Sequence, residues 1–195
     1  MNITATDPRP AYAAVTEWVR TLLGNVTTDQ LALPTPCDEF DVRTLAQHIL
    51  AVGLRAEALA TRATVDGQPV LADHYDANTF GQIRERALAA WAVAPLDREV
   101  QVPWGTVPGA AALGMYVNET LVHGWDLAVA TGQNAEFSDS DIVAAAFAVV
   151  QSALPAQIRE MDDVPFGPVV EPREEAGPTE RLANWSGRSS AEWVG

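Results

Sequence analysis

Apolar residues recur every three to four positions through most of this sequence, and this period constrains the fold more than any other feature. Residues 41–63 show it clearly, with Leu45, Ile49 and Val52 on one stripe. Four further segments have the same period, at about residues 9–23, 72–93, 109–131 and 138–161. Only residues 98–105 alternate like a short extended segment. The pattern therefore predicts an all-α fold.

The predicted helices have recognisable ends. Asp41 is a good N-cap for the second helix, Ser138 is one for the fifth, and Gly132 is a usual stop for the fourth. Long helices joined by connections of differing length favour a four-helix bundle. We expect one domain over residues 1–195, in which residues 162–195 form an irregular tail with a short additional helix near residues 179–185.

Charge and composition exclude several classes of function. The net charge is −14, and an acidic surface repels nucleic-acid backbones and anionic membranes, so we expect neither partner. No apolar run reaches the roughly 20 residues that cross a bilayer. The N-terminus has no signal-peptide pattern, and a single cysteine, Cys37, fits a reducing compartment. We therefore expect a cytoplasmic protein whose partner is a small molecule. The sequence leaves open whether the protein forms a homodimer.

One group of residues indicates chemistry. Glu119 and His123 lie four positions apart, so a helix projects both from one face. A second histidine, His48, lies among apolar residues in another predicted helix. Two imidazoles and one carboxylate from two helices can bind a divalent metal and leave a position open for water or substrate. Each residue alone could equally be a satisfied core group, and the pattern by itself leaves both interpretations open.

Residues near this group have open roles. Asp126 follows His123 by three positions and could orient it. It could equally be a helix-surface carboxylate or pair with a basic residue of a neighbouring helix. Trp104 follows a proline in a loop, where it could line a pocket. We expect His74 to be an exposed residue at a helix start. We interpret Cys37 as a structural, partly buried cysteine, since neighbouring acidic residues do not favour a thiolate.

Two motifs carry a family resemblance. The two motifs are Thr35-Pro36-Cys37-Asp38-Glu39-Phe40-Asp41-Val42-Arg43-Thr44-Leu45-Ala46-Gln47-His48 and Glu119-Thr120-Leu121-Val122-His123-Gly124-Trp125-Asp126-Leu127-Ala128-Val129-Ala130-Thr131-Gly132. Two shorter segments add to them: Pro103-Trp104-Gly105 and Leu182-Ala183-Asn184-Trp185-Ser186-Gly187-Arg188. Together they resemble the mycothiol-dependent maleylpyruvate isomerase N-terminal domain family, part of the DinB/YfiT-like metal-binding bundles. The sequence departs from the family at Phe40, where tryptophan is usual. It also differs in length, because the isomerase after which the family is named looks like a longer, two-domain protein.

The resemblance implies a DinB-like four-helix bundle in which His48, Glu119 and His123 bind a divalent metal, usually zinc, with nickel as the alternative. It also implies mycothiol, the low-molecular-weight thiol of actinobacteria, as cosubstrate. We therefore expect a thiol transferase or isomerase-like enzyme that acts on a small electrophile. A metal-dependent hydrolase and a non-catalytic regulatory bundle remain the alternatives, and a fourth protein ligand would favour the latter. No catalytic acid or base is identifiable from the sequence.

Overall fold

The computed structural model of the protein describes residues 7–38, 40–160 and 167–194. Its α-helices are α1 (Arg9–Gly24), α2 (Val42–Arg62), α3 (Ala77–Val93), α4 (Gly109–Thr131), α5 (Ser140–Ala153) and α6 (Pro178–Trp185). Two short strands, β1 (Glu99–Val102) and β2 (Gly105–Pro108), and two 3-10 turns, η1 (Thr28–Gln30) and η2 (Ala156–Glu160), make up the other regular elements of these ranges. The predicted all-α class is confirmed.

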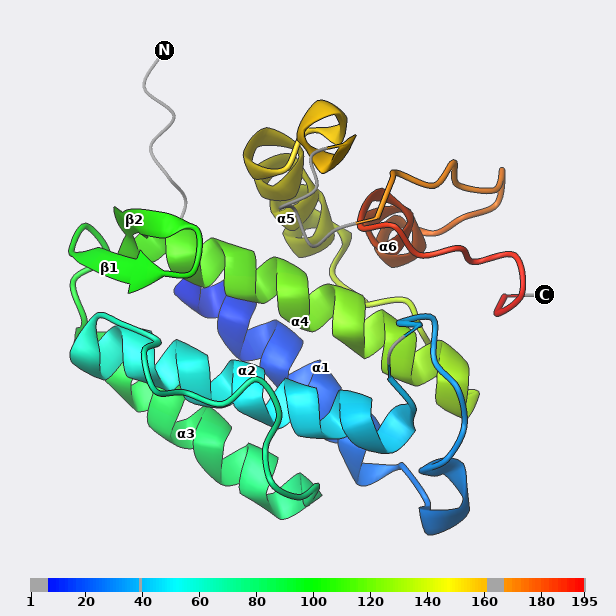
Figure 1. Ribbon diagram of the computed structural model, residues 1–195, viewed down its shortest axis with the longest axis horizontal. Coiled ribbons are helices and arrows are strands. Elements are labelled where there is room, and N and C mark those ends of the chain that lie inside the picture. The colour runs from blue at the N-terminus through cyan, green and yellow to red at the C-terminus, as the bar shows by residue number, and fades with distance from the viewer. Residues whose placement is uncertain (1–6, 39, 161–166, 195) are drawn as a thin grey trace.

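The helices form a DinB-like bundle around α4. Helix α1 packs against α3 and α4, and α2 packs against the same two helices. Helices α5 and α6 pack against α4 on the side that faces away from α3 (Figure 1). Because α4 has neighbours on nearly every side, most of its residues are buried, Trp125 among them. Glu119 and His123, two of the three predicted metal ligands, therefore lie on the central helix of the bundle.

The ends of α2 follow from local chemistry. The Asp41 carboxylate accepts a hydrogen bond of 2.8 Å from the backbone N–H of Thr44, which satisfies one of the unpaired donors of the first turn. At the other end Ala63 takes a left-handed conformation with φ of 61°, and its N–H bonds to the carbonyl of Leu59. These caps fix where the helix that carries His48 begins and ends.

A β-hairpin joins α3 to α4. Strands β1 and β2 pair antiparallel, with Gln101 opposite Thr106, and Pro103 and Trp104 form the turn between them. The N–H of Gln101 donates to the carbonyl of Ala63 over 2.7 Å, so the hairpin is held at the end of α2. The sequence predicted only the first of these two strands.

Two predicted helices differ from the structure at their ends. Helix α3 begins at Ala77 and not near Ala72, because the Asp76 side chain caps it and Ala72 instead donates to the carbonyl of Gln47 on α2. Helix α5 ends at Ala153, because Pro155 disfavours a helical conformation at the residue before it.

The start of α5 also shifts, since Asp139 caps it in place of Ser138. Its predicted end at Met161 lies outside the described residues. Within the described ranges, each helix is too short or too polar to span a bilayer.

Candidate metal centre

Helices α2 and α4 bring His48, Glu119 and His123 together. One potential ligand atom from each residue lies within 4.8 Å of those of the other two. Nε2 of His48 is 3.4 Å from Oε1 of Glu119, and the two imidazole rings meet edge-on with centroids 4.8 Å apart. The four-residue spacing on α4 does place Glu119 and His123 on one face, opposite His48. The arrangement matches the expected ligand set in kind and in grouping.

Each histidine has one nitrogen engaged by an acceptor. Nδ1 of His48 lies 3.0 Å from the carbonyl oxygen of Val70, in the loop after α2. Nδ1 of His123 lies 3.1 Å from Oδ2 of Asp126. An ionised carboxylate can only accept, so the His123 ring is best assigned with the proton on Nδ1, which leaves its Nε2 available to a metal. The two nitrogens of His48 both face acceptors, the Val70 carbonyl at Nδ1 and the Glu119 carboxylate at Nε2. With the proton on Nδ1, Nε2 would be the nitrogen that His48 offers to a metal.

Asp126 is wholly buried and is held from two sides. Besides His123, it accepts a hydrogen bond of 3.0 Å from an Nη of Arg188, and Nε of Arg188 lies 3.3 Å from both of its oxygens. Arg188 comes from the segment after α6, 62 residues along the chain from Asp126. Asp126 is therefore not a helix-surface carboxylate: it contacts His123 and pairs with a basic residue, which lies after α6 and not on a helix.

Burial and charge set the protonation of the group. Burial lowers the pKa of His123 and outweighs the opposing effect of Asp126, so the imidazole is neutral near pH 7. Burial raises the pKa of Asp126, but Arg188 and His123 outweigh it and hold that pKa below its ordinary value. Burial raises the pKa of Glu119 too, but the neighbouring His48 and His123 outweigh it and hold that pKa below its ordinary value. A neutral His123 imidazole and an ionised Glu119 carboxylate are protonation states that suit metal ligands.

A small cavity lies against the group inside the bundle. Its volume is about 10 Å³, roughly the room for one water molecule. Glu119, His123, Tyr12 and Phe80 are among the residues that line it. This cavity therefore has room for a water molecule beside the candidate centre but not for a larger ligand.

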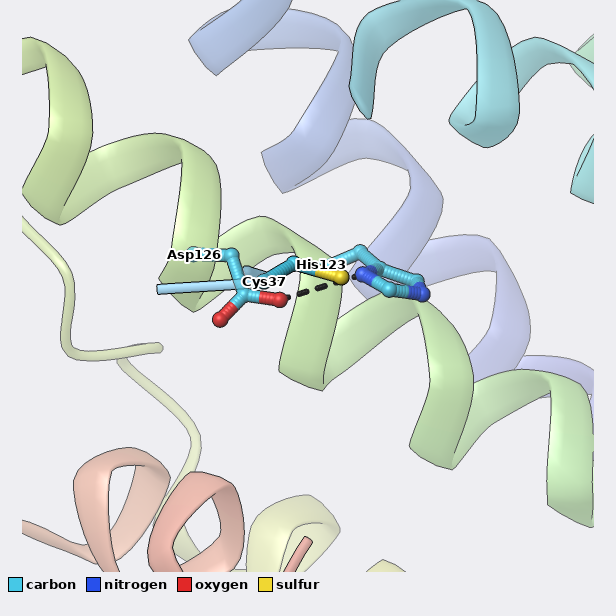
Figure 2. A group of neighbouring side chains, drawn as sticks. All are labelled: Cys37, His123 and Asp126. Carbon is cyan, nitrogen blue, oxygen red and sulfur yellow. Dashed lines mark hydrogen bonds and ion pairs between the residues drawn. The ribbon is translucent and has the colours of Figure 1, made fainter. Parts of the chain in front are cut away.

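Cys37 lies closer to the group than the sequence suggested. Its sulfur is within 4.8 Å of potential ligand atoms of His123 and Asp126, and Figure 2 shows the three side chains side by side. Cys37 is partly buried, as expected. However, Asp126 is already engaged by the Arg188 guanidinium, which would repel a second cation. Of the two groups, His48, Glu119 and His123 are therefore the better ligand set.

The other predicted residues lie elsewhere. His74 is exposed, but in the loop before α3 and not in a helix. Trp104 lies in the hairpin turn with 57% of its surface exposed, and it is absent from the residues around the small cavity. Sequence reasoning missed Arg188 as a site residue. The available signal was its place in the Asn184-Trp185-Ser186-Gly187-Arg188 motif.

Comparisons with known proteins place these residues in a family. Residues 12–128 match the sequence model described as the mycothiol maleylpyruvate isomerase N-terminal domain. The match contains the three candidate ligands and Asp126 but not Arg188. Uncharacterized proteins from two strains of Mycobacterium tuberculosis are each 30% identical over 188 residues, which is 94% of this chain and 98% of theirs. No solved structure is significantly similar to the chain.

Proposed function

Because the chain belongs to the mycothiol maleylpyruvate isomerase N-terminal domain family, we propose that it binds a divalent metal through His48, Glu119 and His123 and uses it to present a thiol to a small electrophile. The observation that carries the proposal is the convergence of the three side chains within 4.8 Å across two helices. Zinc is the ion we propose first, with Ni²⁺ as the alternative, and mycothiol is the proposed cosubstrate.

The donor set fits such an ion. Two imidazoles and one carboxylate are a known ligand combination of catalytic zinc sites, which keep a fourth position open. A bound ion there would lower the pKa of a thiol or water at the open position. The chain's own residues would do the rest: Val70 and Asp126 hold the two rings in one tautomer, and Glu119 supplies the single ligand charge.

The placement of Cys37 and His74 supports an open site. Either residue, as a fourth ligand, would have favoured a structural metal in a non-catalytic bundle. Cys37 groups with His123 and Asp126 and not with His48 and Glu119, and His74 is exposed in a loop. An open position also suits a hydrolase, so the test has to use a thiol.

Elemental analysis tests the metal first. We expect purified protein to carry about one divalent ion per chain. His123→Ala should lose it because one of three ligands is gone, whereas the control His74→Ala should keep it. Equal metal content in the two variants would contradict the ligand assignment.

Isothermal titration with mycothiol then tests the function. Binding should release a proton, because the free thiol is mostly protonated near pH 7 and the ion binds the thiolate. Apparent affinity should therefore rise with pH up to the pKa of the free thiol. Binding that is equally tight after metal removal, or absent with metal fully loaded, would refute thiol activation and leave the hydrolase and the regulatory bundle.

A further inference from the structure

Arg188 reaches the candidate centre from outside residues 12–128, the part of the chain that matches the family model. Its side chain is 15% exposed, and its guanidinium lies on Asp126. A second Nη donates to the carbonyl of Ser186 over 3.0 Å. Its backbone N–H donates to the carbonyl of Ala183, and its carbonyl accepts from the Asn184 amide. The backbone and the head of this arginine are therefore both fixed.

The contact between Arg188 and Asp126 is well suited to hold a carboxylate in one orientation. Donors of the guanidinium lie 3.0–3.3 Å from the two carboxylate oxygens. A planar guanidinium that contacts both oxygens restricts rotation of the carboxylate, which a point charge does not. Oδ2, the oxygen that receives the shortest of these bonds, is also the one that faces Nδ1 of His123.

Without the arginine, Asp126 would lose the donors that contact both of its oxygens. The carboxylate is fully buried, and of these partners only His123 would remain. A buried carboxylate that has lost its donors turns toward other ones. Such a turn would release Nδ1 of His123 and let the imidazole proton move to Nε2, the nitrogen needed by a metal.

We propose that Arg188 is a positioning residue for the metal centre, which holds the Asp126 carboxylate in one orientation so that His123 keeps its proton on Nδ1 and presents Nε2. This inference rests on the proposed function only where it concerns metal binding, because the tautomer of the His123 ring is a property of the metal-free protein. It makes the segment after α6 part of the site, although residues 12–128 alone match the family.

A second arginine in the same segment provides a matched control. Arg173 forms an ion pair with Glu180, whose side chain is 3% exposed, with contacts of 2.7 and 3.0 Å. Like Arg188 it pairs with a buried carboxylate, but this carboxylate belongs to α6 and not to the candidate centre. Arg188→Gln and Arg173→Gln therefore each remove an ion pair with a buried carboxylate, and only the first touches the centre.

The decisive measurement is ¹⁵N NMR of the histidine rings in metal-free protein near pH 7. In the wild type, His123 should be the Nδ1–H tautomer, and an Nε2–H ring there would overturn the proposal without any variant. Arg188→Gln should give a mixture of tautomers or a shift toward Nε2–H. Arg173→Gln should leave the ring as in the wild type. An unchanged ring in Arg188→Gln, or an equal change in both variants, would refute a positioning role.

Metal affinity is the second readout. Loss of a group that orients a ligand typically weakens metal binding about 10- to 100-fold, and we expect this for Zn²⁺ with Arg188→Gln but not with Arg173→Gln. Arg188→Lys keeps the charge without the two-oxygen contact and should recover part of the loss. If wild-type protein binds no metal, the proposed function fails, while the ring measurement still decides the role of Arg188.

Discussion

Asp126 illustrates how one buried side chain couples stability to the candidate site. Its carboxylate balances Arg188 and accepts from His123, and no part of it reaches solvent. A buried ion pair contributes little more to folding stability than an apolar pair of the same size, but the loss of one partner leaves the other as an unpaired buried charge. The two residues should therefore behave as a unit in mutational tests.

We expect Asp126→Asn to lower the free energy of unfolding by about 3 kcal/mol, because the largely buried Arg188 guanidinium then lacks a carboxylate. Urea denaturation near pH 7 measures this. The double variant Asp126→Asn/Arg188→Gln should lose less than the sum of the single changes. Simple additivity would show that the two side chains do not interact in solution.

The same variant gives a pH dependence. The folded pKa of Asp126 is depressed below 3.8, so its stabilising effect is fully present above 3.8 and is lost as pH falls through the folded value. The difference in unfolding free energy between wild type and Asp126→Asn should accordingly be constant near neutral pH and shrink in strong acid. A difference that grew on acidification would mean that the folded pKa is raised.

At the scale of elements, α4 packs closely against α1 at Gly124. A Cβ built on Gly124, next to His123, would lie 2.3 Å from the Trp18 ring and 2.9 Å from Val19, both on α1. The Trp18 ring also packs against Phe137, with centroids 5.6 Å apart, so it has little room to move. Glycine at this position sets the distance between the two helices.

We expect Gly124→Ala to destabilise the protein by about 1–3 kcal/mol, because the added methyl group forces α1 and α4 apart. Gly114→Ala is the control in the same helix, since its Cβ would meet only Val149 at 3.8 Å. There the better helix propensity of alanine should stabilise by about 0.5–1 kcal/mol. Thermal and urea unfolding of both variants check the pair. Similar effects in the two variants would exclude close packing as the cause.

The sequence predicted elements well where local chemistry decides them. Asp41 and Gly132 end their helices as expected, because a cap acts within one turn. The start of α3 could not be predicted in the same way, since Ala72 bonds to Gln47 of another helix. Periodicity and motif were enough to single out the candidate ligands His48 and His123, which the structure places close together. Arg188 did not, because its partner Asp126 lies 62 residues away and no periodic pattern joins them.

At the scale of the whole molecule, charge works against the fold. The chain has 26 acidic and 12 basic residues, so negative charges outnumber positive ones by more than two to one. Several arginines pair with a carboxylate at the surface, as Arg20 does with Glu17, and exposed pairs of this kind contribute little. Mutual repulsion among the remaining acidic groups should lower the stability of the compact state at low ionic strength.

We therefore expect the thermal midpoint to rise as NaCl increases from about 10 mM to about 0.5 M, where the Debye length falls from roughly 30 Å to a few ångströms. Differential scanning calorimetry at pH 7 measures it. KCl should act alike, because screening does not depend on the identity of the ion. A midpoint that fell with either salt would point to ion pairs, and not to repulsion, as the dominant electrostatic contribution.

Cys37 gives this molecule a single chemical handle at a useful place. It is the one cysteine of the chain, and its sulfur lies within 4.8 Å of His123 and Asp126. A thiol-directed spin label or fluorophore would therefore attach at one position, beside the candidate centre, with no engineering of other cysteines. The distance between that label and a paramagnetic ion bound at the centre could then be measured in protein of the native sequence.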